Sequence, residues 1–100
     1  MAVIAHVTLR GVDRESYDKV RAECGWLERP PVGGYAHLSW WEGADNHNVD
    51  AWEDEAAFTV FGEGRLGPAM AKVGITVEPD VTFYPAHEVF LPEPKRLTAS

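Results

Sequence analysis

Two histidines and one aspartate carry the chemistry that this sequence of 100 residues offers most clearly. His6, His37 and Asp50 each stand in a segment where apolar and polar residues alternate, the pattern of a β-strand. A carboxylate beside an imidazole orients the ring and raises its basicity, so the pair can deprotonate a phenol or an activated carbon. The sequence therefore predicts these three residues as a catalytic set, with a polar network that only satisfies buried groups as the alternative.

Aromatic and polar residues at alternating positions of the same segments give a second set. Flat aromatic side chains stack on flat ligands, although aromatic residues on an inward-facing surface also serve as core. The residues predicted to contact a small apolar or aromatic ligand are Tyr35, Ser39, Trp41, Trp52, Tyr84 and His87.

The four histidines of the chain raise the question of a metal or a haem. None of them has the close spacing of a dedicated zinc motif, so no metal site is predicted. A lone histidine can hold a haem iron, and His6, His37 or His87 is available for that role. The chain lacks a Cys-x-x-Cys-His attachment segment, so haem binding is the weaker alternative and no cofactor is predicted.

Composition limits the partners that the protein can have. With 45% hydrophobic and 25% charged residues, the chain reads as one globular domain. Its formal net charge of −7 argues against nucleic acid and against an anionic membrane surface, because both attract clustered Lys and Arg. No basic leader or long apolar segment occurs, and Cys24 has no cysteine partner, so we expect a cytoplasmic protein.

The elements that must position these residues follow from periodicity and from caps. Residues 3–9, 35–43 and 47–53 and part of 75–84 read as strands. A helix is expected from Asp13 to Cys24, and a second begins at Asp54 and is interrupted by glycines between residues 62 and 67. Residues 1–91 form the predicted domain, and residues 92–100 form an extended or disordered tail.

The order strand, helix, strand, strand, helix, strand predicts an α+β fold, the ferredoxin-like βαββαβ arrangement. Its four strands form an antiparallel sheet. Right-handed crossovers place both helices on one face of the sheet and leave the other face open.

Alternation within each strand assigns its residues to one of these faces. We expect the uniformly apolar set Ala36, Leu38 and Trp40 beneath the helices, and we expect Trp41 on the open face. A turn at residues 44–46 would pair Glu42 with His47. The residues expected on the open face are His6, Thr8, Tyr35, His37, Ser39, Trp41, Asp50, Trp52 and Tyr84.

An open sheet face rich in aromatic side chains invites aggregation in a monomer. A second copy packed against it would remove that exposure and enclose a cavity. The sequence therefore predicts a homodimer that binds a small ligand.

Five segments in order along the chain resemble one known superfamily. They are residues 11–17 (GVDRESY), 49–53 (VDAWE), 55–58 (EAAF), 65–68 (RLGP) and 84–87 (YPAH). The chain is similar to the dimeric α/β-barrel superfamily, in particular to small proteins grouped with antibiotic-biosynthesis monooxygenases. The resemblance implies a ferredoxin-like homodimer with a pocket between sheet and helices, where Asn, Trp and His surround a phenolic substrate whose own anion activates oxygen.

The same superfamily includes polyketide cyclases, haem-binding proteins and stress-related proteins, and fold alone does not select among them. Our leading hypothesis is a cofactor-independent monooxygenase or cyclase that acts on an aromatic, polyketide-like molecule in secondary metabolism. The alternative is a ligand-binding or stress-related dimeric barrel without catalysis.

Overall fold

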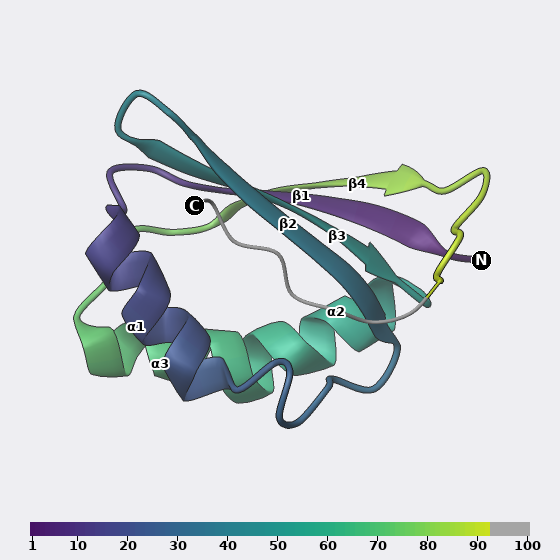
Figure 1. The fold of residues 1–100 in the computed structure, drawn as a ribbon, viewed down its shortest axis with the longest axis horizontal. Helices are drawn as coiled ribbons and strands as arrows, with labels where there is room; N and C mark the ends of the chain where they lie inside the picture. The colour runs from purple at the N-terminus through teal and green to yellow at the C-terminus, as the bar shows by residue number, and fades with distance from the viewer. Residues whose placement is uncertain (93–100) are drawn as a thin grey trace.

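The computed structural model describes residues 1–92, so the predicted tail lies outside the described residues except for Pro92. Four strands form one antiparallel sheet in the order β2-β3-β1-β4, and all helices lie against one face of it (Figure 1). The predicted α+β, ferredoxin-like fold is confirmed. The strands are β1 (Val3–Leu9), β2 (Gly34–Glu42), β3 (Asp45–Trp52) and β4 (Asp80–Pro85), and the helical elements are α1 (Arg14–Cys24), α2 (Glu55–Phe61), η1 (Gly62–Leu66) and α3 (Gly67–Val73).

Helix α1 begins and ends where its capping residues predict. The Asp13 carboxylate accepts a hydrogen bond of 2.8 Å from the Ser16 backbone N–H, which satisfies a donor that the first turn leaves free. Gly25 ends the helix in the left-handed conformation at φ 58°, and its N–H donates to the Arg21 carbonyl. These two caps fix which face of α1 turns toward the sheet.

The second helical region is interrupted, as its glycines suggest. Asp54 caps α2, and its carboxylate accepts from the Ala57 N–H at 2.8 Å. The chain then widens into the π-helical segment η1 before it returns to α-helix in α3, which ends at Gly74. Single π-helical turns inside α-helices often occur beside functional sites.

The face of β1 and β4 that packs on the helices is the predicted one. Val3, Ala5, Val7 and Leu9 are buried, and Phe83 of β4 packs against the same core. No helix within residues 1–92 is both long and apolar enough to cross a membrane.

The prediction for the faces of β2 and β3 is wrong. The hairpin turns on two residues, Gly43 and Ala44, so Glu42 pairs with Asp45 instead of His47. Gly43 has φ 59° while Ala44 has negative φ, the pattern of a type II′ turn, which fits the twist of antiparallel strands. Registers with β1 then place Trp52 opposite Val3 and Asp50 opposite Ala5, on the helix side.

Side-chain volume and mutual hydrogen bonding explain the reversal. Trp52 is 0% exposed, and its ring packs against Trp26, Phe58 and Phe61 at centroid distances of 5.4–5.6 Å. The polar residues that share its face hydrogen-bond with one another, which removes most of the cost of burying them. A prediction from apolar character alone therefore placed the wrong set of β2 and β3 residues beneath the helices.

The open face of the sheet consequently carries the apolar set. Leu38 is 59% exposed and Trp40 is 39% exposed, where both were expected beneath the helices. We call this surface the open face, and its members are Ile4, His6, Leu38, Trp40, His47, Val49, Ala51 and Tyr84.

Candidate functional site

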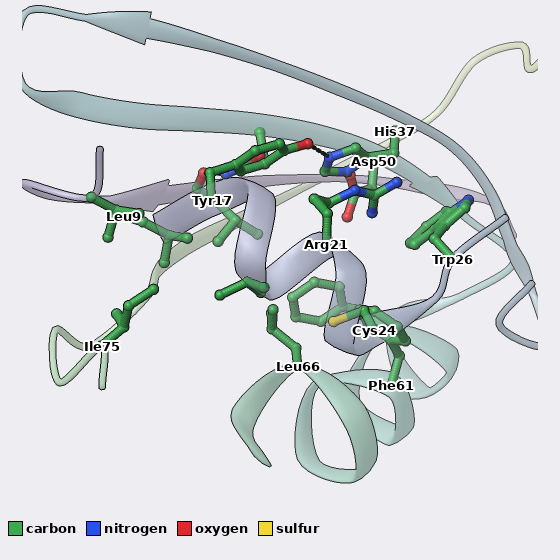
Figure 2. Close-up of a pocket in the computed structure, with 15 residues that line it drawn as sticks. Leu9, Tyr17, Arg21, Cys24, Trp26, His37, Asp50, Phe61, Leu66 and Ile75 are labelled. Carbon is green, nitrogen blue, oxygen red and sulfur yellow. Dashed lines mark hydrogen bonds and ion pairs between the residues drawn. The ribbon is translucent and has the colours of Figure 1, made fainter. Parts of the chain in front are cut away.

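A cavity lies between the helix-facing side of the sheet and the helices, with side chains from α1, β1, β2, β3 and the α2–η1 region around it (Figure 2). Its free volume is about 540 Å³ when open solvent at the mouth is counted, and the centre of a water molecule can move through about 50 Å³ of it. Most of the wall is apolar. The polar side chains that reach it are Tyr17, Arg21, His37, Asn48 and Asp50.

Three of these polar side chains form a hydrogen-bonded chain. The Tyr17 hydroxyl lies 2.7 Å from His37 Nε2, and His37 Nδ1 lies 2.6 Å from Asp50 Oδ1. The His37 and Asp50 side chains are 15% and 8% exposed, so water screens their interaction poorly. Asp50 also accepts from the Trp52 indole N–H at 3.4 Å, which holds the carboxylate from its other side.

The partners fix the tautomer of His37. Because the Asp50 carboxylate only accepts, the proton of neutral His37 sits on Nδ1, and Nε2 accepts from the Tyr17 hydroxyl. A proton that leaves Tyr17 has a base ready to receive it, and a carboxylate stabilises the resulting imidazolium. The arrangement can therefore move a proton away from a group that hydrogen-bonds to the Tyr17 oxygen.

Burial raises the pKa of the Tyr17 hydroxyl, and the nearby positive charge of Arg21 opposes that shift. Tyr17 is therefore neutral at physiological pH and acts as a hydrogen-bond donor and proton carrier. Its ring packs edge-on against Trp41 at 5.4 Å, and the Trp41 indole donates to the Val12 carbonyl at 2.8 Å. Trp41 thus positions Tyr17 from behind.

Asn48 lines the cavity and has a side-chain acceptor that makes no hydrogen bond. Its amide nitrogen donates to the Val7 carbonyl at 3.3 Å and to Asn46 Oδ1 at 2.7 Å, so the amide orientation is set by two acceptors. Within residues 1–92, Asn48 Oδ1 is the buried side-chain nitrogen or oxygen atom that makes no hydrogen bond. A buried orphan acceptor beside a cavity suits a ligand hydroxyl or an ordered water.

The structure brings together two of the three predicted catalytic residues, His37 and Asp50. The expectation that His6 lies with them is wrong, because His6 is on the open face, across the sheet. There its Nε2 lies 3.1 Å from His47 Nδ1, and its ring stacks on Trp40. The alternation of side chains along a strand separates the two histidine sites completely.

The predicted ligand-contacting residues divide in the same way. Ser39, Trp41 and Trp52 were expected on the open face and instead lie on the helix side, where they flank or support the site without lining the cavity. Ser39 accepts from the Asn46 amide at 2.9 Å. The remaining three, Tyr35, Tyr84 and His87, are exposed and lie away from the cavity.

Sequence reasoning missed Tyr17, Arg21 and Asn48 as site residues. Tyr17 and Arg21 are four residues apart and so share one face of α1, the face that also carries the buried residues Val20 and Cys24. A tyrosine in a buried stripe needs a partner for its hydroxyl, and that requirement is the signal that could have found it.

Among residues 1–92, no three His, Cys, Asp or Glu side chains converge closely enough to hold a metal ion. His37 and Asp50 hydrogen-bond to each other at 2.6 Å.

No protein-family model and no curated protein matches the sequence. Solved structures do match. A protein of unknown function from Nitrosomonas europaea has TM-score 0.71 and 16% identity over 93% of this chain and 96% of its own. The Streptomyces coelicolor monooxygenase ActVA-Orf6, in complex with nanaomycin D, has TM-score 0.60 and 21% identity over 92% and 93%.

A variant of SnoaB, a cofactor-independent oxygenase from Streptomyces nogalater, has TM-score 0.58 and 18% identity over 92% of this chain and 96% of that one. Identities this low establish the fold and leave the chemistry open. The resemblance indicated by the sequence is thereby confirmed at the level of fold: the chain has the ferredoxin-like fold of the superfamily that includes small antibiotic-biosynthesis-monooxygenase-like proteins.

Proposed function

We propose that the protein binds a hydroxylated, aromatic, polyketide-like molecule between its sheet and helices and deprotonates it, as a cofactor-independent monooxygenase or cyclase. The observation that carries this proposal is the chain from Tyr17 through His37 to Asp50, with distances of 2.7 and 2.6 Å, in a cavity whose wall is mostly apolar. The likeness to two oxygenase structures supports the choice of reaction.

Proton transfer in this site runs in one direction. A substrate hydroxyl donates to the Tyr17 oxygen while Tyr17 passes its own proton to His37 Nε2, and Asp50 stabilises the imidazolium. The orphan oxygen of Asn48 accepts from a second hydroxyl or holds the same ligand in register. The substrate anion that results is electron-rich and reacts with oxygen or with a carbonyl of the same molecule.

For an oxygenase of this kind, the atoms balance without a reductant. An activated ring CH₂ and O₂ give a ring C=O and water, because the second oxygen atom leaves with the two hydrogens of the methylene. The enzyme supplies the base and a dry, apolar site in which the anion is not quenched by solvent.

The space of about 50 Å³ open to the centre of a water molecule is far below the roughly 300–1,000 Å³ of ordinary ligand pockets, so binding of a ring system requires lining side chains to move. Leu66 is one of these lining side chains, and it comes from the π-helical segment η1.

The test is oxygen uptake and product formation from a dihydroxyanthrone, a tricyclic phenol with an activated methylene. We expect turnover by the wild type and a loss of about 10²–10⁴-fold in kcat for His37→Gln, the range for a positioned general base. His87→Gln is the matched control, because His87 is exposed and outside the cavity.

The outcomes separate the alternatives. Tight binding of the anthrone without turnover would favour the ligand-binding barrel over the enzyme. Equal rates for the wild type and His37→Gln would remove the proposed base.

We also propose that two copies pack through their open faces as a homodimer. This surface supports the proposal because it combines exposed apolar groups, such as Leu38 and Trp40, with few charges. Leu38→Asp would place a charge in each half of the interface, and we expect a monomer by sedimentation where the wild type is a dimer. A wild type that sediments as a monomer at micromolar concentration would refute the assembly.

A further inference from the structure

Arg21 lines the cavity, and its positive charge has no role in the reaction proposed above. It lies one helical turn after Tyr17 on α1, is half-buried, and lines the same cavity (Figure 2). Its guanidinium carbon is 5.5 Å from the centre of the Trp26 ring, and the His37 ring is 5.6 Å from that same ring. Arg21 and His37 therefore share Trp26 as a neighbour on the wall of the cavity.

The other arginines of residues 1–92 are engaged elsewhere. Arg10 pairs with Asp80 at 3.0 Å, Arg29 and Arg65 donate to the Cys24 carbonyl, and Arg14 lies over the Trp41 ring at 4.5 Å. The Arg21 guanidinium makes neither a hydrogen bond nor an ion pair with any described residue, and in this it is like Arg14, since each lies over an aromatic ring. Of these two arginines only Arg21 lines the cavity, so its N–H donors are the ones that a ligand there can meet.

A free guanidinium inside an apolar pocket favours one class of ligand. Its planar fork matches the two oxygens of a carboxylate, and charge-assisted hydrogen bonds of this kind are roughly twice as strong as neutral ones. Among residues 1–92, Asp50 is the only carboxylate on the cavity wall, and it already accepts from His37 and Trp52. The complementary anion must therefore come with the ligand.

We propose that the pocket selects aromatic carboxylates, with Arg21 binding the ligand carboxylate while the ligand hydroxyl faces Tyr17. This inference rests on the proposed function and narrows its substrate class from hydroxylated aromatics to hydroxy-aromatic acids. A preference for a carboxylate ligand over a neutral one would point to a local positive charge in the pocket, because the protein as a whole, with a net charge of −7, repels anions. Arg21 is thus a specificity-determining residue, and the proton relay is separate from it.

The experiment compares two probes of the same shape by calorimetry at pH 7. One is a hydroxynaphthoate, and the other is the corresponding hydroxynaphthamide, which keeps the ring and hydroxyl but has no charge. We expect the wild type to bind the acid about tenfold more tightly than the amide. Arg21→Met should bind the two probes equally, with its affinity for the amide unchanged.

Arg14→Met is the matched control, since it removes the same charge from the same helix outside the cavity and should keep the tenfold preference. Arg21→Lys keeps the charge without the fork and should give an intermediate ratio. His37→Gln should also keep the preference, so a failed proton relay and a failed Arg21 assignment give different results.

Equal affinity of the wild type for acid and amide would overturn the inference while leaving the aromatic pocket intact. A drop in preference of the same size in Arg14→Met and Arg21→Met would also overturn it, because the effect would then be the net charge. Absence of binding of either probe to the wild type would refute both the inference and the pocket on which it depends.

Discussion

Replacing Tyr17 with phenylalanine removes the oxygen atom at one end of the hydrogen-bonded chain and leaves the aromatic packing in place. The lost bond is the 2.7 Å contact with His37 Nε2. A hydrogen bond between neutral groups contributes about 1 kcal/mol net to stability, and an acceptor left without a partner adds to the loss. Since the His37 side chain is 15% exposed, water can replace part of the bond.

The expected cost is therefore about 1–2 kcal/mol in the free energy of unfolding, which lowers the melting temperature by about 5–15 °C for a domain of this size. Thermal and urea unfolding followed by far-ultraviolet circular dichroism measure it. Tyr84→Phe is the matched control, because Tyr84 is 50% exposed on the open face and should shift stability by less than about 0.5 kcal/mol.

The same variant tests the relay. If the substrate proton passes through Tyr17, kcat for the anthrone should fall by about 10²–10⁴-fold, as for loss of a general acid–base group. Unchanged stability together with unchanged kcat would refute the geometry and the mechanism derived from it. Reduced stability with full activity would mean that His37 reaches the substrate directly.

Alkaline titration gives an independent measure of Tyr17. Burial raises its pKa above the ordinary value of 10.0, so the folded state holds a proton that the unfolded chain releases. The contribution of the protonated Tyr17 hydroxyl to the free energy of unfolding is complete below pH 10. It is lost as the pH rises from 10 through the pKa of Tyr17 in the folded state. Tyr17→Phe should flatten this decline relative to the wild type, whereas Tyr84→Phe should leave the Tyr17 contribution to it unchanged.

Three further changes have defined outcomes. Asp50→Asn keeps the shape of the side chain, but its NH₂ group must face either His37 or Trp52, which both donate to Asp50. We expect the free energy of unfolding, measured with urea, to fall by about 1–3 kcal/mol. We also expect most of the activity, measured as oxygen uptake, to be lost. Gly62→Ala and Gly64→Ala add methyl groups that meet nothing within 4 Å, so each should stabilise the fold by about 0.5–1 kcal/mol. Each should also slow ligand entry, measured by stopped-flow fluorescence. A faster on-rate would contradict the idea that movement of η1 admits the ligand. Burial raises the pKa of the Cys24 thiol above 9.0, so stability should also decline from pH 9 upward, and Cys24→Ala should abolish that part of the decline.

Local signals in the sequence were sufficient for the elements and their order. Asp13, Gly25 and Asp54 bound the helices because capping is decided within a few residues of the chain. Local sequence does not determine which residues of the β2–β3 hairpin face the helices. That depends on whether the turn holds two residues or three, and on which set of side chains can fill the space under the helices.

The candidate site was half predictable for the same reason. His37 and Asp50 were identified because their chemistry is visible in residue type, and their pairing survives the error in register. Tyr17 comes from another element, and only the position of α1 against β2 brings its hydroxyl to His37. His6 lies on the open face as predicted, and it is separated from His37 and Asp50 because the faces of β2 and β3 were predicted the wrong way round.

The two adjacent tryptophans of β2 have a consequence for how the protein can change over evolution. Trp40 belongs to the surface proposed for assembly and Trp41 packs against Tyr17, and the same alternation runs through residues 37–41 of the strand. Substitutions at positions 37, 39 and 41 therefore alter the helix side of the sheet, and substitutions at positions 38 and 40 alter the open face. A directed library at positions 37, 39 and 41 would exploit that independence.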